Sequence, residues 1–212
     1  MRARPVLCLA LVVAAGGCSD ATGPRSAAVQ PPPLVADVVA PPSALPILRQ
    51  AATAPLLKTY RVSFWAKRGT QTTVFVNYRR RPYEWLSDSY LRFRIPINGL
   101  VAGADGVPLA RGDSVLITLT LDTVYFKVAF EPSGVVFSSS SPAQLTFWYK
   151  NADPDLNGDG LVNTADATLK QCLSIWTRNG KGRWGKLTSK NDPYQQAITA
   201  DVFHFSEYAV SW

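Results

Sequence analysis

The sequence predicts an all-β protein, an antiparallel β-sandwich, over residues 58–212. Three observations predict it. Hydrophobic residues recur at every second position in several short runs, and the chain is 11% aromatic, with six Trp and eight Tyr. Turn residues such as Asn98-Gly99 and Ser133-Gly134 separate the runs. A period of two puts alternate side chains on opposite faces of a strand, and aromatic residues favour packed sheets. We therefore expect about seven to nine strands in two sheets.

Each expected strand alternates apolar and polar residues, so that one face is buried and the other faces solvent. The strands are expected at residues 60–66, 74–78, 91–95, 115–121, 124–130, 145–149 and 202–212. Between Lys170 and Lys190 the sequence has six Lys or Arg residues and no acid, which predicts a solvated hairpin. The alternative is a basic surface, formed together with residues 79–81, for acidic glycans or lipopolysaccharide.

The N-terminus predicts export and lipidation. Arg2 and Arg4 precede an apolar stretch, residues 6–15, that is too short for a stable transmembrane helix. The stretch ends in Ala15-Gly16-Gly17-Cys18, which resembles the lipobox of bacterial lipoproteins, although Leu is usual where Ala15 stands. The resemblance implies removal of residues 1–17 and acylation of the Cys18 thiol. The alternative is an ordinary signal peptide that leaves a free thiol, and both interpretations send the chain out of the cytoplasm.

A Pro-rich segment separates Cys18 from the expected sandwich. Residues 18–57 contain Pro31-Pro32-Pro33 and Pro41-Pro42 and no aromatic residue, so the segment cannot build a core. We expect a disordered tether that holds the domain away from a membrane surface. In a polyproline II conformation, at about 3.1 Å per residue, it would reach on the order of 100 Å.

One loop, residues 155–166, has the residue types and spacing of a calcium site. Oxygen-bearing side chains stand at the first, third, fifth, ninth and twelfth positions, a backbone carbonyl at the seventh, and a glycine, Gly160, at the sixth, where an EF-hand loop turns sharply. The expected ligands are the side chains of Asp155, Asn157, Asp159, Asn163 and Asp166 and the carbonyl of Leu161. This spacing turns alternate side chains inward around one large cation. The alternative is a metal-free turn rich in Asp and Asn.

The same loop resembles the calcium loop of dockerins, which has Asp at its last position and leads directly into a helix. We expect that helix at residues 165–173, with Ala165, Leu169, Cys172 and Leu173 on its apolar face. Dockerins carry two such loops, whereas this chain has one, inside the sandwich sequence. The resemblance therefore implies calcium binding by an insert over residues 153–173, but not docking to a cohesin. A single extracellular loop should bind calcium with a Kd on the order of 10⁻⁴ to 10⁻³ M.

The second half of the expected sandwich is similar to ZU5-like domains. The similarity covers residues 110–212. It lies in residues 130–137 (FEPSGVVF) and 142–147 (PAQLTF), which resemble a corner of those domains, and in residues 202–210 (VFHFSEYAV), which resemble their closing strand. It implies a structural or interaction unit, in which His204 is a structural residue of the last strand.

The composition excludes several classes of function. With one His and three Cys the chain can form neither a His-clustered zinc site nor a disulfide framework, and the serine run at residues 138–141 has no adjacent base. The net charge is +7, and removing residues 1–17 with their two Arg lowers it by two to +5, which is low for a nucleic-acid-binding surface. We expect a non-catalytic, monomeric lipoprotein of the cell envelope, anchored in a membrane by lipid, with a structural or interaction role and a protein or glycan partner.

Two other functions remain open. A carbohydrate-binding module would stack sugars on Trp65, Trp148 or Trp184. Trp65 and Trp148 fall on the polar phase of their strands, and the favoured interpretation is that the tether or the inserted loop covers them. The second alternative is an extracytoplasmic hydrolase, which the single His disfavours.

Overall fold

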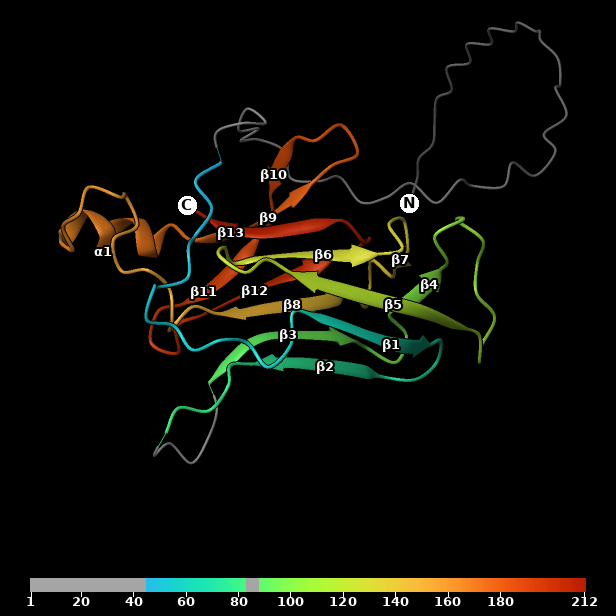
Figure 1. Cartoon of the computed structure of the whole chain (residues 1–212). Coiled ribbons are helices and arrows are strands. Elements are labelled where there is room, and N and C mark those ends of the chain that lie inside the picture. Colours follow the sequence, from blue (N-terminus) through green and yellow to red (C-terminus); the bar gives the residue numbers. More distant parts are fainter. Residues whose placement is uncertain (1–44, 83–87) are drawn as a thin grey trace, which may run out of the picture. The chain divides into compact units, whose positions relative to one another are not determined.

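The computed structural model describes residues 45–82 and 88–212 (Figure 1). The predicted signal peptide, Cys18 and the tether as far as residue 44 lie outside these residues. Within them the chain forms thirteen β-strands and one short helix. The predicted antiparallel β-sandwich is confirmed, since every strand pairs with its sheet neighbours in antiparallel register.

Two sheets make up the sandwich. The six-stranded sheet consists, in spatial order, of β1 (Arg61–Lys67), β5 (Ser114–Leu121), β6 (Lys127–Glu131), β13 (Glu207–Ser211), β9 (Ser174–Arg178) and β10 (Trp184–Lys186). The five-stranded sheet consists of β11 (Ser189–Asp192), β12 (Ala197–Val202), β8 (Ala143–Trp148), β3 (Ser89–Ile95) and β2 (Thr72–Asn77). A separate short pair consists of β4 (Leu100–Ala102) and β7 (Val136–Phe137).

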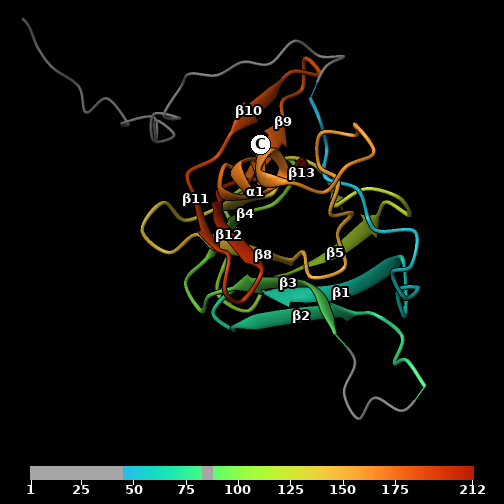
Figure 2. The ribbon, with the colours of Figure 1, turned by 90° about the vertical axis from the view of Figure 1, so that its left-hand side faces the viewer.

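Consecutive strands connect the two sheets at both edges of the sandwich. The edge strand β1 leads through a short turn into β2, the edge strand of the other sheet, and β10 leads in the same way into β11. Figure 2 shows β1 and β2 together at the bottom of the molecule, and β10 and β11 on the opposite side. The edges that carry unpaired backbone groups therefore lie next to each other in pairs.

The period-two pattern determines which side chains form the core. Alternate residues of the central strands are almost fully buried: Leu91, Phe93, Ile95, Ile117, Leu119, Leu145 and Phe147. Between the sheets the Phe93 and Phe130 rings lie 4.7 Å apart, and Phe130 stacks on Phe205 at 4.8 Å. Ring pairs of this kind add about 0.5–1.5 kcal/mol each to the stability that burial provides.

Residues 45–57, which the sequence analysis placed in the tether, pack against the sandwich instead. We call them the strap. Leu48 and Leu57 are each only 1% exposed and belong to the hydrophobic core. The Leu48 N–H donates to the carbonyl of Val210 (2.9 Å), and the Phe126 N–H donates to the carbonyl of Leu48 (2.8 Å). The sandwich domain therefore includes the strap, because two large apolar side chains outweigh its Pro-rich composition.

The strap also holds the base of the inserted loop. The Ala51 N–H donates to the carbonyl of Asn151 (2.9 Å), and the Asp153 N–H donates to the carbonyl of Arg49 (2.9 Å). The loop therefore begins from a backbone that is fixed on the sandwich.

The helix that follows the loop is α1 (Thr164–Gln171), close to the expected range of 165–173. The prediction of which helix residues are buried is wrong in part. Leu173, just beyond the helix, is buried, but Ala165 and Cys172 are exposed and the buried residue of the helix is Asp166. The reason is that the first turn of this short helix, which carries Asp166, faces the loop, and the helix has no apolar stripe there. In the part of the chain that the structure describes, no helix has the length and apolar character needed to cross a membrane.

The predicted hairpin between Lys170 and Lys190 is confirmed as β9 and β10, which pair in antiparallel register. Its basic side chains are exposed at Arg178, Lys181, Arg183, Lys186 and Lys190. The hairpin also buries two large rings, Trp176 and Trp184, which form a small second cluster with Ala209. It is therefore solvated on its charged side and packed on its aromatic side.

Candidate functional site

In the predicted calcium loop, the first carboxylate organises the backbone around it. The Asp155 carboxylate accepts hydrogen bonds from the N–H groups of Gly158 (2.8 Å), Asp159 (3.2 Å) and Gly160 (2.8 Å). Gly158 and Gly160 have φ angles of 74° and 85°, in the left-handed region that favours glycine. A Cβ at either glycine would meet nothing within 4 Å, so the backbone conformation, and not crowding, requires glycine there.

The middle ligands of the expected set make the same kind of contact. Each accepts a hydrogen bond from the N–H of the residue two positions further along the chain. The pairs are Asn157 Oδ1 with Asp159 N (3.1 Å), Asp159 Oδ1 with Leu161 N (2.8 Å) and Asn163 Oδ1 with Ala165 N (2.7 Å). These bonds tie one oxygen atom of each side chain to the backbone of its own loop, while the three residues themselves stay exposed.

The last carboxylate, Asp166, joins the two ends of the loop. It is 3% exposed and accepts hydrogen bonds from the N–H groups of Leu156 (2.7 Å), Asn157 (3.3 Å) and Asn163 (2.9 Å). The N–H of Asn163 is the largest cause that holds the pKa of this carboxyl below its ordinary value, and the other two add to it. Asn163 also caps α1, and the two residues form a capping box. Asp166 therefore stays ionised at neutral pH.

The oxygen atoms of the loop fit calcium in type. A carboxylate offers about four lone-pair positions, so three N–H bonds still leave about one position free on Asp155 and on Asp166. Carboxylate, amide and carbonyl oxygens are the ligands that calcium prefers. Within residues 45–82 and 88–212, however, no three or more His, Cys, Asp or Glu side chains form a group that could hold a metal ion. A calcium site here would therefore depend on Asn157, Asn163 and the Leu161 carbonyl as well as on the carboxylates.

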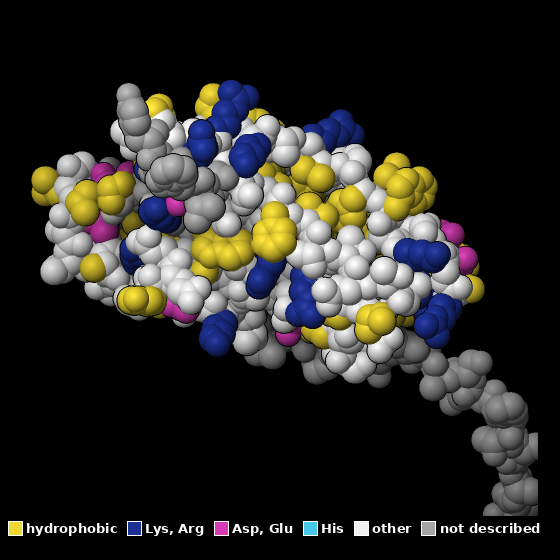
Figure 3. Space-filling model, turned by 90° about the horizontal axis from the view of Figure 1, so that it is seen from below, with side chains coloured by type: hydrophobic (Ala, Val, Ile, Leu, Met, Phe, Trp, Pro, Cys, Tyr) yellow, Lys and Arg dark blue, Asp and Glu magenta, His cyan; other side chains and the backbone are white. Residues whose placement is uncertain are grey.

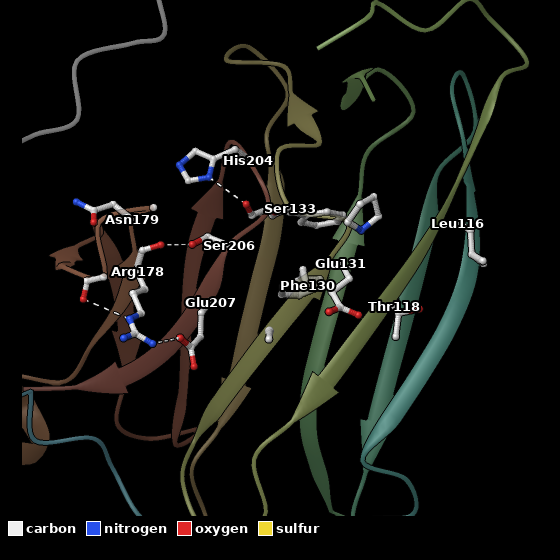
Figure 4. Close-up of a pocket in the computed structure, with 15 residues that line it drawn as sticks. Leu116, Thr118, Phe130, Glu131, Ser133, Arg178, Asn179, His204, Ser206 and Glu207 are labelled. Atoms are coloured by element: carbon white, nitrogen blue, oxygen red, sulfur yellow. Dashed lines mark hydrogen bonds and ion pairs between the residues drawn. The ribbon is translucent and has the colours of Figure 1, made fainter. Parts of the chain in front are cut away.

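A wide hollow of about 1170 Å³ lies on the outer face of the six-stranded sheet (Figure 4). Two of its charged groups, Arg178 and Glu207, are paired with each other. Glu207 lies between two cations, Arg178 Nη1 at 3.0 Å and Lys127 Nζ at 3.1 Å from its two oxygen atoms. Glu131, which is exposed, faces the same hollow. The hollow therefore combines one ion pair, Arg178 with Glu207, and the exposed carboxylate of Glu131 with a largely apolar lining.

The hollow lacks the contacts of a serine hydrolase. The Ser206 hydroxyl donates to the carbonyl of Arg178 and not to an imidazole. His204 Nδ1 lies 3.5 Å from the carbonyl of Phe205, and Figure 4 shows its ring at the rim, away from the carboxylates of Glu131 and Glu207. Among the described residues that line the hollow, no hydroxyl is hydrogen-bonded to the imidazole, so the hollow gives the hydrolase alternative no support.

The three candidate tryptophans have different environments. Trp65 is 65% exposed and lies opposite Leu116, which is 45% exposed and lines one end of the hollow. The described residues, the strap and the inserted loop included, therefore leave Trp65 uncovered, because the polar phase of β1 faces solvent. Trp148 is half-buried, and its cover is the guanidinium of Arg92, 5.7 Å from the ring centroid. Trp184 is 5% exposed, too buried to stack a ligand.

The exposures of Trp65 and Trp184 predict that their substitutions reduce stability by very different amounts. Trp184→Ala should lower the free energy of unfolding by about 3 kcal/mol, because it removes a buried ring from the β9–β10 hairpin. Trp65→Ala should change it by less than about 0.5 kcal/mol, because the ring is already in water. Urea denaturation of both variants measures the difference, and equal losses would contradict this account of the two rings.

The sequence analysis missed a second group of side chains, on the outer face of the five-stranded sheet. Arg92 and Arg94 project from β3, and Phe75 projects from β2 opposite Arg92. The signal was present, since all three residues fall on the polar phase of the expected strands 74–78 and 91–95. What the sequence did not show is that the strands pair so as to bring them together.

Comparisons with known proteins give no relative: no family model, no curated protein and no solved structure matches the chain. The resemblances to lipoproteins, ZU5-like domains and dockerin loops therefore remain predictions from the sequence.

Proposed function

We propose that this protein is a non-catalytic lipoprotein of the cell envelope, whose β-sandwich is a surface interaction module with a loop ordered by calcium. One observation carries the calcium part of the proposal: all five side chains of the expected ligand set accept hydrogen bonds from amides of their own loop. The anchor is supported by the sequence of residues 15–18, which precedes the described part of the chain.

Calcium should stabilise the whole domain and not only the loop. The base of the loop is hydrogen-bonded to the strap at Arg49 and Ala51, and the strap contributes Leu48 to the core. Without a cation, Asp155, Asp159 and Asp166 place three negative charges in one loop, and a pair that a cation drew to about 4 Å would cost on the order of 1 kcal/mol in water if the cation were absent. Calcium replaces this repulsion with attraction and binds the folded loop better than the unfolded chain.

The test is the melting temperature of the protein with and without calcium. At a calcium concentration about 100 times Kd the expected stabilisation is about 2.7 kcal/mol. Magnesium should raise the melting temperature much less, because its strict octahedral geometry suits this loop poorly. Asp155→Ala and Asp159→Ala should each abolish the calcium response.

Asp153→Ala is the matched control. It removes a carboxylate just before the loop and outside the expected ligand set, so the response to calcium should persist even if the hydrogen bond from Asp155 N to Asp153 Oδ1 (3.2 Å) is lost. If calcium leaves the melting curve of the wild-type protein unchanged, and calorimetry detects no heat at millimolar calcium, the loop is a metal-free turn and the calcium proposal fails.

A second candidate function is carbohydrate binding. The observation that favours it is the exposure of aromatic side chains on both outer faces, with Trp65 65% exposed on one sheet and Phe75 54% exposed on the other. Aromatic rings contribute strongly to interfaces, so each exposed ring offers a surface on which a sugar ring can pack. Binding to a panel of immobilised polysaccharides tests it, and no retention on any of them would exclude it as the role of the rings.

A further inference from the structure

Two arginines stand side by side on the outer face of the five-stranded sheet without a carboxylate partner. Arg92 and Arg94 alternate along β3 with the buried residues Leu91, Phe93 and Ile95. In the part of the chain that the structure describes, the side-chain ion pairs involve Lys127, Lys150 and Arg178 as the cations. Alternate residues of a strand are about 7 Å apart, so two like charges face solvent at close range.

The register of the neighbouring strands brings no acid next to these arginines. Arg92 has Phe75 on one side and Thr146 on the other, and Arg94 has Thr73 and Gln144. Directly paired residues of neighbouring strands form a row across the sheet. The first acid in the row of Arg92 or of Arg94 is Asp201, which is paired with Gln144. Asp201 lies two strands from β3, a backbone distance of about 10 Å. Gln144 Nε2 donates to that carboxylate at 3.5 Å. The positive charge of the face is therefore not neutralised by its neighbours.

Both guanidinium groups are held in place. Arg92 Nη2 donates to Thr146 Oγ1 (3.3 Å), its guanidinium lies 5.7 Å from the Trp148 ring centroid, and its Nε is buried without a partner. Arg94 Nη2 donates to Gln71 Oε1 (2.8 Å). An arginine has five N–H donors, so one hydrogen bond orients each group and leaves donors for a ligand. Oriented guanidinium groups bind carboxylates in a bidentate way and lose little entropy in doing so.

An exposed ring lies next to these charges. Phe75, 54% exposed, is the direct cross-strand neighbour of Arg92. Figure 3, which views the molecule from below Figure 1, shows Lys and Arg side chains around hydrophobic ones in the middle of the visible face, and acidic side chains mostly toward its margins. An apolar surface beside oriented donors suits a ligand that has both a ring with an apolar side and a carboxylate.

A third cation lies further along the Arg92 row. The row continues from Thr146 to Thr199 and then to Lys190, which is exposed on β11. Measured along the backbone, Lys190 is three strands from β3, or about 14 Å, whereas residues 92 and 94 are about 7 Å apart. Cations spaced in this way match charges that repeat along a polymer better than a single small anion.

We propose that this face, formed by Phe75, Arg92, Arg94, Trp148 and Lys190, binds an acidic polysaccharide. The carboxylates of its uronic acid residues meet the arginines, and a sugar ring packs on Phe75. The proposal rests on the second candidate function, carbohydrate binding, and names its ligand class and surface. It does not depend on calcium.

The test measures binding of the full chain, in detergent, to polygalacturonate by affinity electrophoresis or calorimetry. EDTA is present throughout, so that calcium neither bridges the polymer nor orders the loop. We expect binding that weakens as salt is raised, because exposed charges are screened. Methyl-esterified polygalacturonate, with the same backbone but masked carboxylates, and neutral dextran should bind at least tenfold more weakly.

The variants locate the site. Arg94→Gln and Phe75→Ala should each weaken binding of polygalacturonate about tenfold or more, while their urea denaturation midpoints show that both still fold. The matched controls lie on the other sheet: Arg61→Gln removes an exposed arginine and Leu116→Ala removes an exposed apolar side chain, and neither should change binding.

Four results would overturn the proposal: no binding of polygalacturonate, equal binding of the esterified polymer, loss of binding in the two controls but not in Arg94→Gln and Phe75→Ala, and binding to phosphatidylglycerol vesicles without binding to the polymer. The last result would assign the face to an anionic membrane surface. The melting response to calcium, measured separately on the same variants, should be unchanged, so the two proposals can fail independently.

Discussion

Leu48→Ala is expected to lower the free energy of unfolding by about 3 kcal/mol. Leu48 is 1% exposed and packs in the main core, and removal of a buried leucine costs both its transfer free energy and the cavity that it leaves. The side chain lies in the strap, 13 residues before β1 begins at Arg61 (61 − 48 = 13). Urea denaturation, followed by tryptophan fluorescence, measures the loss.

Leu56→Ala is the matched control for this substitution. It removes the same atoms from the same strap, but Leu56 is 60% exposed, so the free energy of unfolding should change by less than about 0.5 kcal/mol. If both variants were as stable as the wild-type protein, residues 45–57 would behave as a free tether in solution, and the packing of the strap would be contradicted.

Cys18→Ala is expected to move the whole protein from the membrane fraction to the soluble fraction. We proposed acylation of this thiol, and each CH₂ group of an acyl chain that enters the bilayer contributes about 0.8 kcal/mol to anchoring. Without the chains the membrane attachment is lost. Fractionation of expressing cells measures the shift, and mass spectrometry of the wild-type protein should show the added lipid.

Cys172→Ala is the control for the anchor. Cys172 is an exposed free thiol in the described domain, so its removal should leave the protein in the membrane fraction. Wild-type protein that carries no lipid, or release by Cys172→Ala instead of Cys18→Ala, would contradict the lipoprotein proposal.

The long strands could be predicted from the sequence, and the short ones could not. Residues 91–95 and 115–121 were expected as strands and are found within β3 (Ser89–Ile95) and β5 (Ser114–Leu121), because several alternations in a row define a period of two. Strands of two to four residues, such as β7 (Val136–Phe137), are too short to show a period. They form because tertiary contacts bring their partners alongside.

For the candidate sites, the sequence indicated contacts between residues that are close along the chain. It did not indicate contacts that depend on how distant strands pair. The side chains singled out in the loop all accept hydrogen bonds from nearby amides of the same loop, and such contacts are local in the sequence. The burial of Asp166 was not expected, because a helix pattern assigns buried positions to apolar residues. The cluster of Phe75, Arg92 and Trp148 joins three strands, and its register depends on the whole sheet. Leu48 was missed for the same reason.

The strap determines how the domain would respond to mechanical load. A pull on the chain ahead of Leu45 acts first on Ile47, Leu48 and Gln50, whose backbone contacts are made with the last strand, the β5–β6 connection and the base of the inserted loop. These contacts follow one another along the strap, so they would open one after another at low force, while the sheets behind them still share their load among many hydrogen bonds. The strap would then detach first and lengthen the chain before the two sheets are strained.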